Sequence, residues 1–203
     1  MIKNVVFDFG NTLIRFKPKD MVALYVHNAE DAAQIETAVF RNEGWQKLDR
    51  DEITDDMFLS SVYERLPERL HEKALEVYRN WIYHLPEIEG MRNLIVRIKQ
   101  EYGVHVFLLS NISRYFAAHS KDVPVLKEME ACIFSAVCGH YKPNQDIYAY
   151  MCTTFGILPE ETVFIDDSGA NIAVAEQYGI QGYLFDGDAQ KLSVYLDTLL
   201  KQA

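Results

Sequence analysis

The stretch VVFDFGNTL, residues 5–13, predicts the central strand of the fold and the turn that follows it. A run of apolar residues leads into Asp8, and the turn formers Gly10 and Asn11 follow soon after it. Continuous apolar runs are typical of strands covered on both faces, and Gly and Asn tolerate the positive φ of a turn. We therefore expect Asp8 at the carboxyl end of a central strand, where ligands bind in open α/β sheets. An Asp that only caps the next turn is the alternative.

The second half of the sequence alternates between apolar runs of strand length and amphipathic helical segments. Strands are expected at residues 104–109, 133–137, 162–165 and 182–186. Helices are expected at residues 90–102, 146–155 and 190–201, and a further helix is expected to end at Tyr178, where Gly179 stops it. An alternation of strand and helix predicts a parallel sheet with right-handed crossovers and helices on both faces. The fold class is therefore α/β, with a Rossmann-like core.

Between the first strand and the remaining ones lies a segment with helical periodicity throughout. Met21, Leu24 and Tyr25 share one helical face. Thr54 is typical of a helix N-cap, because two acidic residues of a first turn follow it. We expect an all-helical cap domain over residues 18–85, inserted into an α/β core domain of residues 1–17 and 86–203.

The composition excludes several classes of function. The net charge is −10, from 20 basic and 30 acidic residues, whereas nucleic acids and anionic membranes bind basic surfaces. Cys132, Cys138 and Cys152 are odd in number and lack metal-ligand spacing, so we expect buried free thiols. With no secretory signal and no apolar run of membrane-spanning length, a cytoplasmic protein is expected.

Polar side chains follow the ends of the expected strands. They are Asp8, Ser110 with Asn111, Lys142, and Asp166 with Asp167. Because the carboxyl ends of parallel strands point the same way, these groups can converge, although Ser110 or Asn111 could instead cap a helix and Lys142 could be a surface lysine. Two adjacent carboxylates repel each other, and Mg²⁺ is a common compensating cation at sites of oxygen ligands. We therefore expect a magnesium site at Asp166-Asp167.

These four stretches, in this order around a helical insert, resemble the motifs of the haloacid dehalogenase-like hydrolase superfamily, and the insert resembles its first type of cap. The tract at residues 45–58 resembles the cap segment of a subgroup with the bacterial α-glucose-1-phosphate phosphatases. It also resembles the amino-terminal phosphatase domain of soluble epoxide hydrolase. The resemblance implies a Mg²⁺-dependent phosphatase that hydrolyses a small phosphate monoester, with a sugar phosphate favoured.

The resemblance also implies a role for each site residue. Asp8 would attack phosphorus and form an aspartyl-phosphate, which water then hydrolyses. Lys142 would neutralise the charge of Asp8 and of the phosphate. The expected Mg²⁺ ligands are Asp8, the backbone carbonyl of Gly10, and Asp167; the expected phosphate-binding residues are Ser110, Asn111 and Lys142; and the expected supporting residues are Thr12, Asp166 and Asn171, the last of which would order a metal-bound water.

One position departs from the family pattern. Most phosphatases of the superfamily carry an aspartate two residues after the nucleophile, which protonates the leaving group, and this chain has Gly10 there. General acid–base catalysis contributes a factor of about 10²–10⁴. We hypothesise that a cap residue, a water or the substrate replaces the missing acid, with Asp49, Glu52 and His84 as the cap candidates.

The missing aspartate leaves other functions open. A 2-haloacid dehalogenase needs no leaving-group proton, but it uses no metal and has no need of paired acids at residues 166–167. A non-catalytic phosphate-binding protein is the other alternative, and a phosphomutase is disfavoured because it needs the missing acid. The aromatic residues Trp45, Tyr63, Trp81 and Tyr83 could stack on a substrate or pack the cap, and Arg114 could reach a distal group of the substrate or be solvated.

Overall fold

The computed structural model describes residues 1–201 and contains a parallel sheet of five strands in the order β3-β2-β1-β4-β5. Each pair of neighbouring strands is parallel, and Val6 of the central strand lies between Phe107 and Phe164 in register. This sheet confirms the predicted α/β class. The strands are β1 (Asn4–Phe7), β2 (His105–Ser110), β3 (Ala131–Phe134), β4 (Thr162–Asp166) and β5 (Gln181–Leu184).

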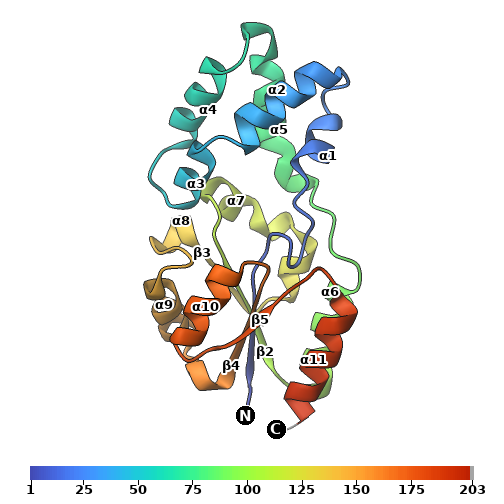
Figure 1. The fold of residues 1–203 in the computed structure, drawn as a ribbon, viewed down its shortest axis with the longest axis vertical. Helices are drawn as coiled ribbons and strands as arrows, with labels where there is room; N and C mark the ends of the chain where they lie inside the picture. Colours follow the sequence, from blue (N-terminus) through green and yellow to red (C-terminus); the bar gives the residue numbers. More distant parts are fainter. Residues whose placement is uncertain (202–203) are drawn as a thin grey trace.

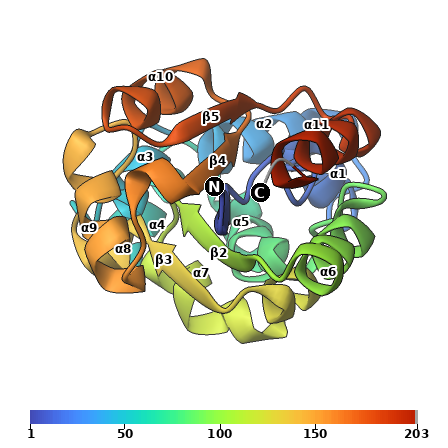
Figure 2. The same ribbon diagram turned by 90° about the horizontal axis from the view of Figure 1, so that it is seen from below.

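Helices cover both faces of the sheet, as Figure 2 shows in a view from below. Successive side chains of a strand point to opposite faces, so Val5 and Phe7 pack in one apolar cluster and Val6 in another. The first cluster includes residues of α6 (Met91–Tyr102), α7 (Arg114–His119) and α11 (Ala189–Lys201). The second includes residues of α9 (Gln145–Phe155) and α10 (Gly169–Gln177).

A separate layer of helices stands over the carboxyl ends of the strands (Figure 1). It has its own apolar cluster, in which Ile35, Phe58 and Val77 are buried. The chain enters and leaves this layer side by side, because Arg15 N donates to Pro86 O (2.8 Å) and Ile88 N donates to Leu13 O (2.9 Å). The division at residues 17/18 and 85/86 stays our proposal. The helices are α1 (Pro18–Ala23), α2 (Ala29–Phe40), α3 (Gly44–Asp49), α4 (Asp55–Glu64) and α5 (His71–Asn80).

Two predicted strands have different limits in the structure. The strand expected at residues 133–137 begins at Ala131 and ends at Phe134, and the short helix α8 (Ser135–Cys138) follows it. A short apolar run fits a buried strand or a buried helical turn equally well, so periodicity does not separate the two. The strand expected at residues 182–186 is β5, which ends at Leu184.

The helix caps, turns and cysteines can also be compared with the local predictions. Thr54 is the N-cap of α4 and accepts a hydrogen bond from Met57 N at 3.2 Å, as predicted. In the turn after β1, Asn11 has positive φ (54°) and Gly10 does not. The three cysteines are free, but only Cys152 is fully buried. No helix within residues 1–201 is both long and apolar enough to span a bilayer.

Candidate active site

The centre of the site is a buried ammonium between two carboxylates from neighbouring strands. Asp8 follows β1 directly and Asp166 ends β4, so parallel pairing of these strands brings their carboxylates together. Lys142 Nζ donates to Asp8 Oδ1 (2.5 Å) and to Asp166 Oδ2 (2.7 Å), and its side chain is 1% exposed. The Lys142 ammonium also lies over the Phe164 ring, 5.2 Å from its centroid. The lysine is therefore part of the core and not a surface residue.

The two adjacent acids at the end of β4 have different environments. Asp166 is fully buried and accepts hydrogen bonds from Lys142, from Ser168 N (2.8 Å) and from Asn171 Nδ2 (3.0 and 2.9 Å). Both of its oxygens are thus occupied by donors. Asp167 is exposed at the mouth of the site. Asp166 thus has its donors from within the protein, and the roles of Asp166 as a supporting residue and Asp167 as a ligand stay predictions.

The carboxylates of Asp8, Asp166 and Asp167 offer oxygens that lie within 4.8 Å of one another. Three acidic groups face a single ammonium, so the cluster has an excess of negative charge that a divalent cation would balance. Hard oxygen donors from one or two carboxylates are the protein ligands that Mg²⁺ prefers. The residues present therefore fit a Mg²⁺ held by Asp8 and Asp167, because Asp166 already has its full set of donors.

Burial changes the acid–base behaviour of this cluster. It raises the pKa of Asp8 to about 7, an effect that the charge of Lys142 opposes and that of Asp166 reinforces. Burial lowers the pKa of Lys142, but the two carboxylates outweigh it, so the net shift is upward and the lysine stays charged. Additional positive charge beside Asp8 would favour its ionised, nucleophilic form.

The turn after β1 presents its backbone toward the same site. Thr12, Leu13 and Ile14 all donate their N–H groups to the carbonyl of Phe9, so these turn bonds do not use the carbonyl of Gly10. That leaves the Gly10 carbonyl available for the ligand role implied for it. The Thr12 hydroxyl is buried, and within residues 1–201 it has no hydrogen-bond partner.

Asn111, at the end of β2, uses its whole side-chain amide to hold another site residue. Its Nδ2 donates to Lys142 O and its Oδ1 accepts from Lys142 N, both at 2.8 Å. This reciprocal pair fixes the backbone of Lys142, a positioning contact that the sequence prediction of phosphate binding did not include. Ser110, one residue earlier, is buried at the strand end and lines the site cavity.

A cavity of about 220 Å³ joins the strand ends to the cap. Core residues form its floor, and the cap contributes Trp45, Asp49 and Trp81 to its wall. Trp45 and Trp81 also pack against each other, with ring centroids 5.3 Å apart, so they both stabilise the cap and line the cavity. Of the predicted site residues, the cavity is lined by Asp8, Gly10, Ser110, Asn111, Lys142 and Asn171.

Several candidates from the sequence lie outside this cavity. Glu52 is exposed, and His84 forms a hydrogen bond with the Tyr25 hydroxyl at 2.5 Å in a different part of the cap. Tyr63 stacks on His71, and Tyr83 is 52% exposed.

Arg114 forms a bidentate ion pair with a cap residue and does not line the cavity. Its Nε and NH2 groups donate to the two carboxylate oxygens of Asp51, at 2.6 and 2.7 Å. Ser135 also joins core and cap, because its hydroxyl donates to the Asp49 carbonyl at 2.5 Å. Both contacts link residues more than 60 positions apart in sequence, and no local pattern could have indicated them.

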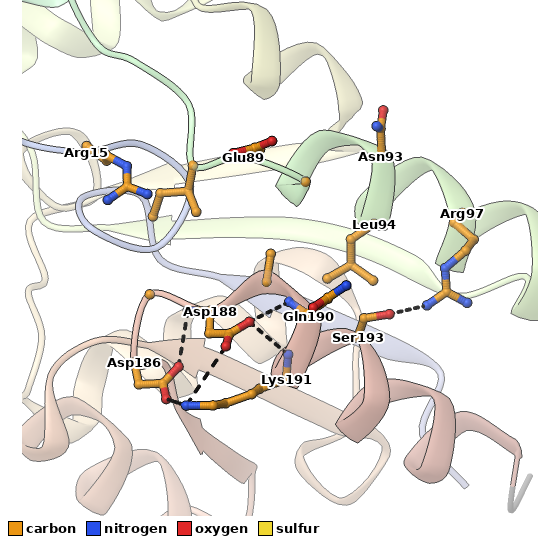
Figure 3. Close-up of a pocket in the computed structure, with 14 residues that line it drawn as sticks. Arg15, Glu89, Asn93, Leu94, Arg97, Asp186, Asp188, Gln190, Lys191 and Ser193 are labelled. Atoms are coloured by element: carbon orange, nitrogen blue, oxygen red, sulfur yellow. Dashed lines mark hydrogen bonds and ion pairs between the residues drawn. The ribbon is translucent and has the colours of Figure 1, made fainter.

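A larger cavity of about 810 Å³ lies between α6 and α11, away from these residues (Figure 3). Several of its polar groups contact one another: Lys191 contacts Asp186 and Asp188, and Arg97 donates to the Ser193 hydroxyl at 2.9 Å. The Asp188 carboxylate accepts from the first N–H groups of α11, at Gln190 and Lys191. None of the residues predicted to be functional lines it, so the cavity below the cap is the candidate active site.

Comparison with known proteins gives the same family as the motifs. The chain is 25% identical to the D-ribitol-5-phosphate phosphatase of Bacteroides thetaiotaomicron over 98% of its own length and 100% of that protein. It is 23% identical to the sesquiterpene phosphatase AstK of Aspergillus oryzae, over 89% of this chain and 88% of that one.

A solved structure of a HAD family enzyme from Bacteroides thetaiotaomicron, an aspartate-to-alanine mutant in complex with magnesium and inorganic phosphate, has the same fold. It superposes with a TM-score of 0.73 at 20% identity, and covers 95% of this chain and 99% of its own. The family model described as haloacid dehalogenase-like hydrolase matches residues 2–179, which is most of the chain. The protein therefore belongs to the haloacid dehalogenase-like hydrolases.

Proposed function

We propose that the protein is a Mg²⁺-dependent phosphatase that hydrolyses a small phosphate monoester, with a sugar phosphate favoured as substrate. The observation that carries this proposal is the buried Asp8–Lys142–Asp166 array next to the exposed residue Asp167. It combines a nucleophile, a fixed cation and hard oxygen ligands at one strand edge. The two curated relatives compared above are both named as phosphatases, which supports the same class of reaction.

The chain's own residues account for the steps of the reaction. The Asp8 oxygen that is not bonded to Lys142 attacks phosphorus, and the bond from phosphorus to the ester oxygen breaks. A water then attacks the aspartyl-phosphate, and Asp8 leaves as a carboxylate. Throughout, Lys142 holds Asp8 in place and offsets negative charge, while Asn111 and Asp166 keep the lysine in position. A bound Mg²⁺, held by Asp8, Asp167 and the Gly10 carbonyl, would supply positive charge to the phosphoryl oxygens.

The cavity limits the size of the substrate. A volume of about 220 Å³ is smaller than most ligand pockets, which run from roughly 300 to 1,000 Å³. The phosphate would lie over Asp8 and the leaving group against the indole rings of Trp45 and Trp81. Flat apolar faces such as these bind aromatic rings and the apolar faces of sugars. A small ester with one ring or a short polyol chain fits this description.

The test is release of p-nitrophenol from p-nitrophenyl phosphate, with Mg²⁺ and with EDTA, for wild type and Asp8→Asn. Turnover that requires both Mg²⁺ and Asp8 supports the proposal. Activity that persists in EDTA, or in Asp8→Asn, contradicts it. Release of chloride from 2-chloropropionate without Mg²⁺ would favour the dehalogenase alternative instead.

A further inference from the structure

Gly10 has no side chain, and no other atoms fill the space that a side chain would occupy there. A Cβ atom built on Gly10 would have no neighbouring atom within 4 Å, and Gly10 does not use the positive φ that favours glycine. The backbone would therefore accept a larger residue there. Gly10 and Asp8 line the same cavity. The missing acid is thus not excluded by steric constraints, and another group can occupy the same volume.

Asp49, the last residue of α3, lines that cavity from the cap side. It is the one titratable group that the cap contributes to the cavity lining within residues 1–201. Asp49 is partly buried, and within residues 1–201 no hydrogen bond or ion pair engages its carboxyl group. Burial raises the pKa of Asp49 well above its usual range, and the nearby charge of Arg50 only partly opposes this.

Asp49 is held by a segment that fastens the cap to the core, which we call the docking loop (residues 49–51). The Asp49 carbonyl accepts from the Ser135 hydroxyl, whose oxygen also accepts from Ile112 N at 2.8 Å. Ile112 directly follows the site residue Asn111. The main chain of Asp49 is therefore tied to the strand end from which the site is built.

The next two residues of the docking loop contact the core through their side chains. The Arg50 guanidinium lies over the ring of Tyr141, 4.4 Å from its centroid, and Tyr141 precedes Lys142. Asp51, which has a φ of 60°, forms the bidentate ion pair with Arg114. Three consecutive residues thus fix this loop on three core segments. Such fixation is what a group needs to face a reacting atom with defined geometry.

We propose that the Asp49 carboxyl is the proton donor to the leaving group, in place of the side chain that Gly10 lacks. This inference rests on the proposed phosphatase function. As Asp8 attacks phosphorus and the phosphorus–oxygen bond breaks, the proton of Asp49 passes to the departing ester oxygen. The products of this step are a neutral alcohol, the aspartyl-phosphate and an Asp49 carboxylate. A proton from water restores the acid before the next turnover.

The test compares two leaving groups that share a phenyl ring and differ in basicity. We would measure kcat/KM for p-nitrophenyl phosphate and phenyl phosphate, because this ratio reports only the steps up to departure of the phenol. p-Nitrophenolate leaves without a proton, whereas phenolate gains from one. For Asp49→Asn, kcat/KM for phenyl phosphate is expected to fall by roughly 10²- to 10⁴-fold, whereas that for p-nitrophenyl phosphate falls by a much smaller factor. Glu52→Gln, an exposed neighbour outside the cavity, is the matched control and should change neither value.

A second variant keeps the test independent of folding effects. Gly10→Asp in the Asp49→Asn background places a carboxyl in the vacant space and should restore kcat/KM for phenyl phosphate. An equal loss on both substrates would indicate a structural role for Asp49 and overturn the proposal, as would no loss on either. Absence of Mg²⁺-dependent turnover in the wild type would instead contradict the proposed function itself.

Discussion

Lys142 Nζ lies 2.7 Å from Asp166 Oδ2, with both side chains 1% exposed, whereas the next residue, Asp167, is exposed. Two adjacent acids therefore have separate tasks. Asp166 completes a buried ion pair with Lys142, and Asp167 is exposed with a carboxylate oxygen within 4.8 Å of those of Asp8 and Asp166. This division leads to opposite consequences for the same substitution at neighbouring positions.

Asp166→Asn is expected to destabilise the protein, and Asp167→Asn to weaken the metal site. Loss of the Asp166 charge leaves a buried donor imperfectly paired, which costs about 1–3 kcal/mol in the free energy of unfolding. At the exposed Asp167 the change should stay within about 0.5 kcal/mol. The Mg²⁺ concentration for half-maximal activity should rise by at least roughly tenfold for Asp167→Asn. Urea unfolding and Mg²⁺ titration measure the two effects. Equal destabilisation by both variants would contradict the assignment.

Arg114→Ala tests the docking loop. The ion pair with Asp51 is exposed, so its loss should change the free energy of unfolding by less than about 1 kcal/mol. Misplacement of Asp49 should nevertheless lower kcat/KM for phenyl phosphate by roughly 10- to 100-fold. Arg41→Ala removes another exposed arginine, which pairs with Glu36 within the cap, and serves as the control. A similar loss of activity in the control would show that cap stability, and not docking, is responsible.

The pH profile of kcat/KM for phenyl phosphate should contain a descending limb that is due to the titration of Asp49. Only its protonated form donates, and because burial raises its pKa, that form persists well above the range near 3.9 where an exposed aspartate titrates. As pH rises through the raised pKa, kcat/KM should fall. The ionisable groups around Asp49 are Arg50, Tyr78 and, across the cavity, Asp8 and Lys142.

The Asp49→Asn variant identifies that limb. Arg50, Tyr78 and the core groups remain in this variant, so a limb due to any of them would persist. We expect the descending limb to disappear, at a uniformly low kcat/KM. A descending limb that is the same in wild type and Asp49→Asn would assign the titration to another group.

Thr54→Ala tests the N-cap at the start of α4. The Thr54 hydroxyl accepts from Met57 N, and the loss of such a cap costs about 1 kcal/mol in the free energy of unfolding. Thr153→Ala makes the same chemical change inside α9, where the hydroxyl donates back to Ala149 O, and it should cost nothing. Urea unfolding compares the two. Equal effects would mean that the hydroxyl of Thr54 does not stabilise the helix.

The sequence was sufficient for the core of the fold and the centre of the site. Asp8 and Asp166 each follow or end an apolar run, and parallel strands carry such positions to one edge. Lys142 lies beyond β3 and α8, and its ammonium reaches both carboxylates. The limits of β3 were wrong because residues 135–138 are apolar enough for either a strand or a helical turn. Local composition locates the strands better than it locates their ends.

The contribution of the cap could not be predicted in the same way. Asp49, Glu52 and His84 are equivalent candidates in the sequence, and only packing of cap on core separates them. The contacts that select Asp49 join it to Ser135 and its loop to Arg114, across long stretches of chain. Such pairs have no local periodicity or motif, so a single sequence does not reveal them.

The central claim is that Asp8 is phosphorylated during turnover, and acid quenching tests it most directly. Wild type and Asp8→Asn would be mixed with p-nitrophenyl phosphate and Mg²⁺, quenched in acid, digested and analysed by mass spectrometry. We predict one added phosphoryl group on the wild-type peptide that contains Asp8, and none in the variant or in EDTA. Turnover without any phosphorylated peptide, or phosphorylation at another residue, would contradict the assignment of Asp8 as the nucleophile.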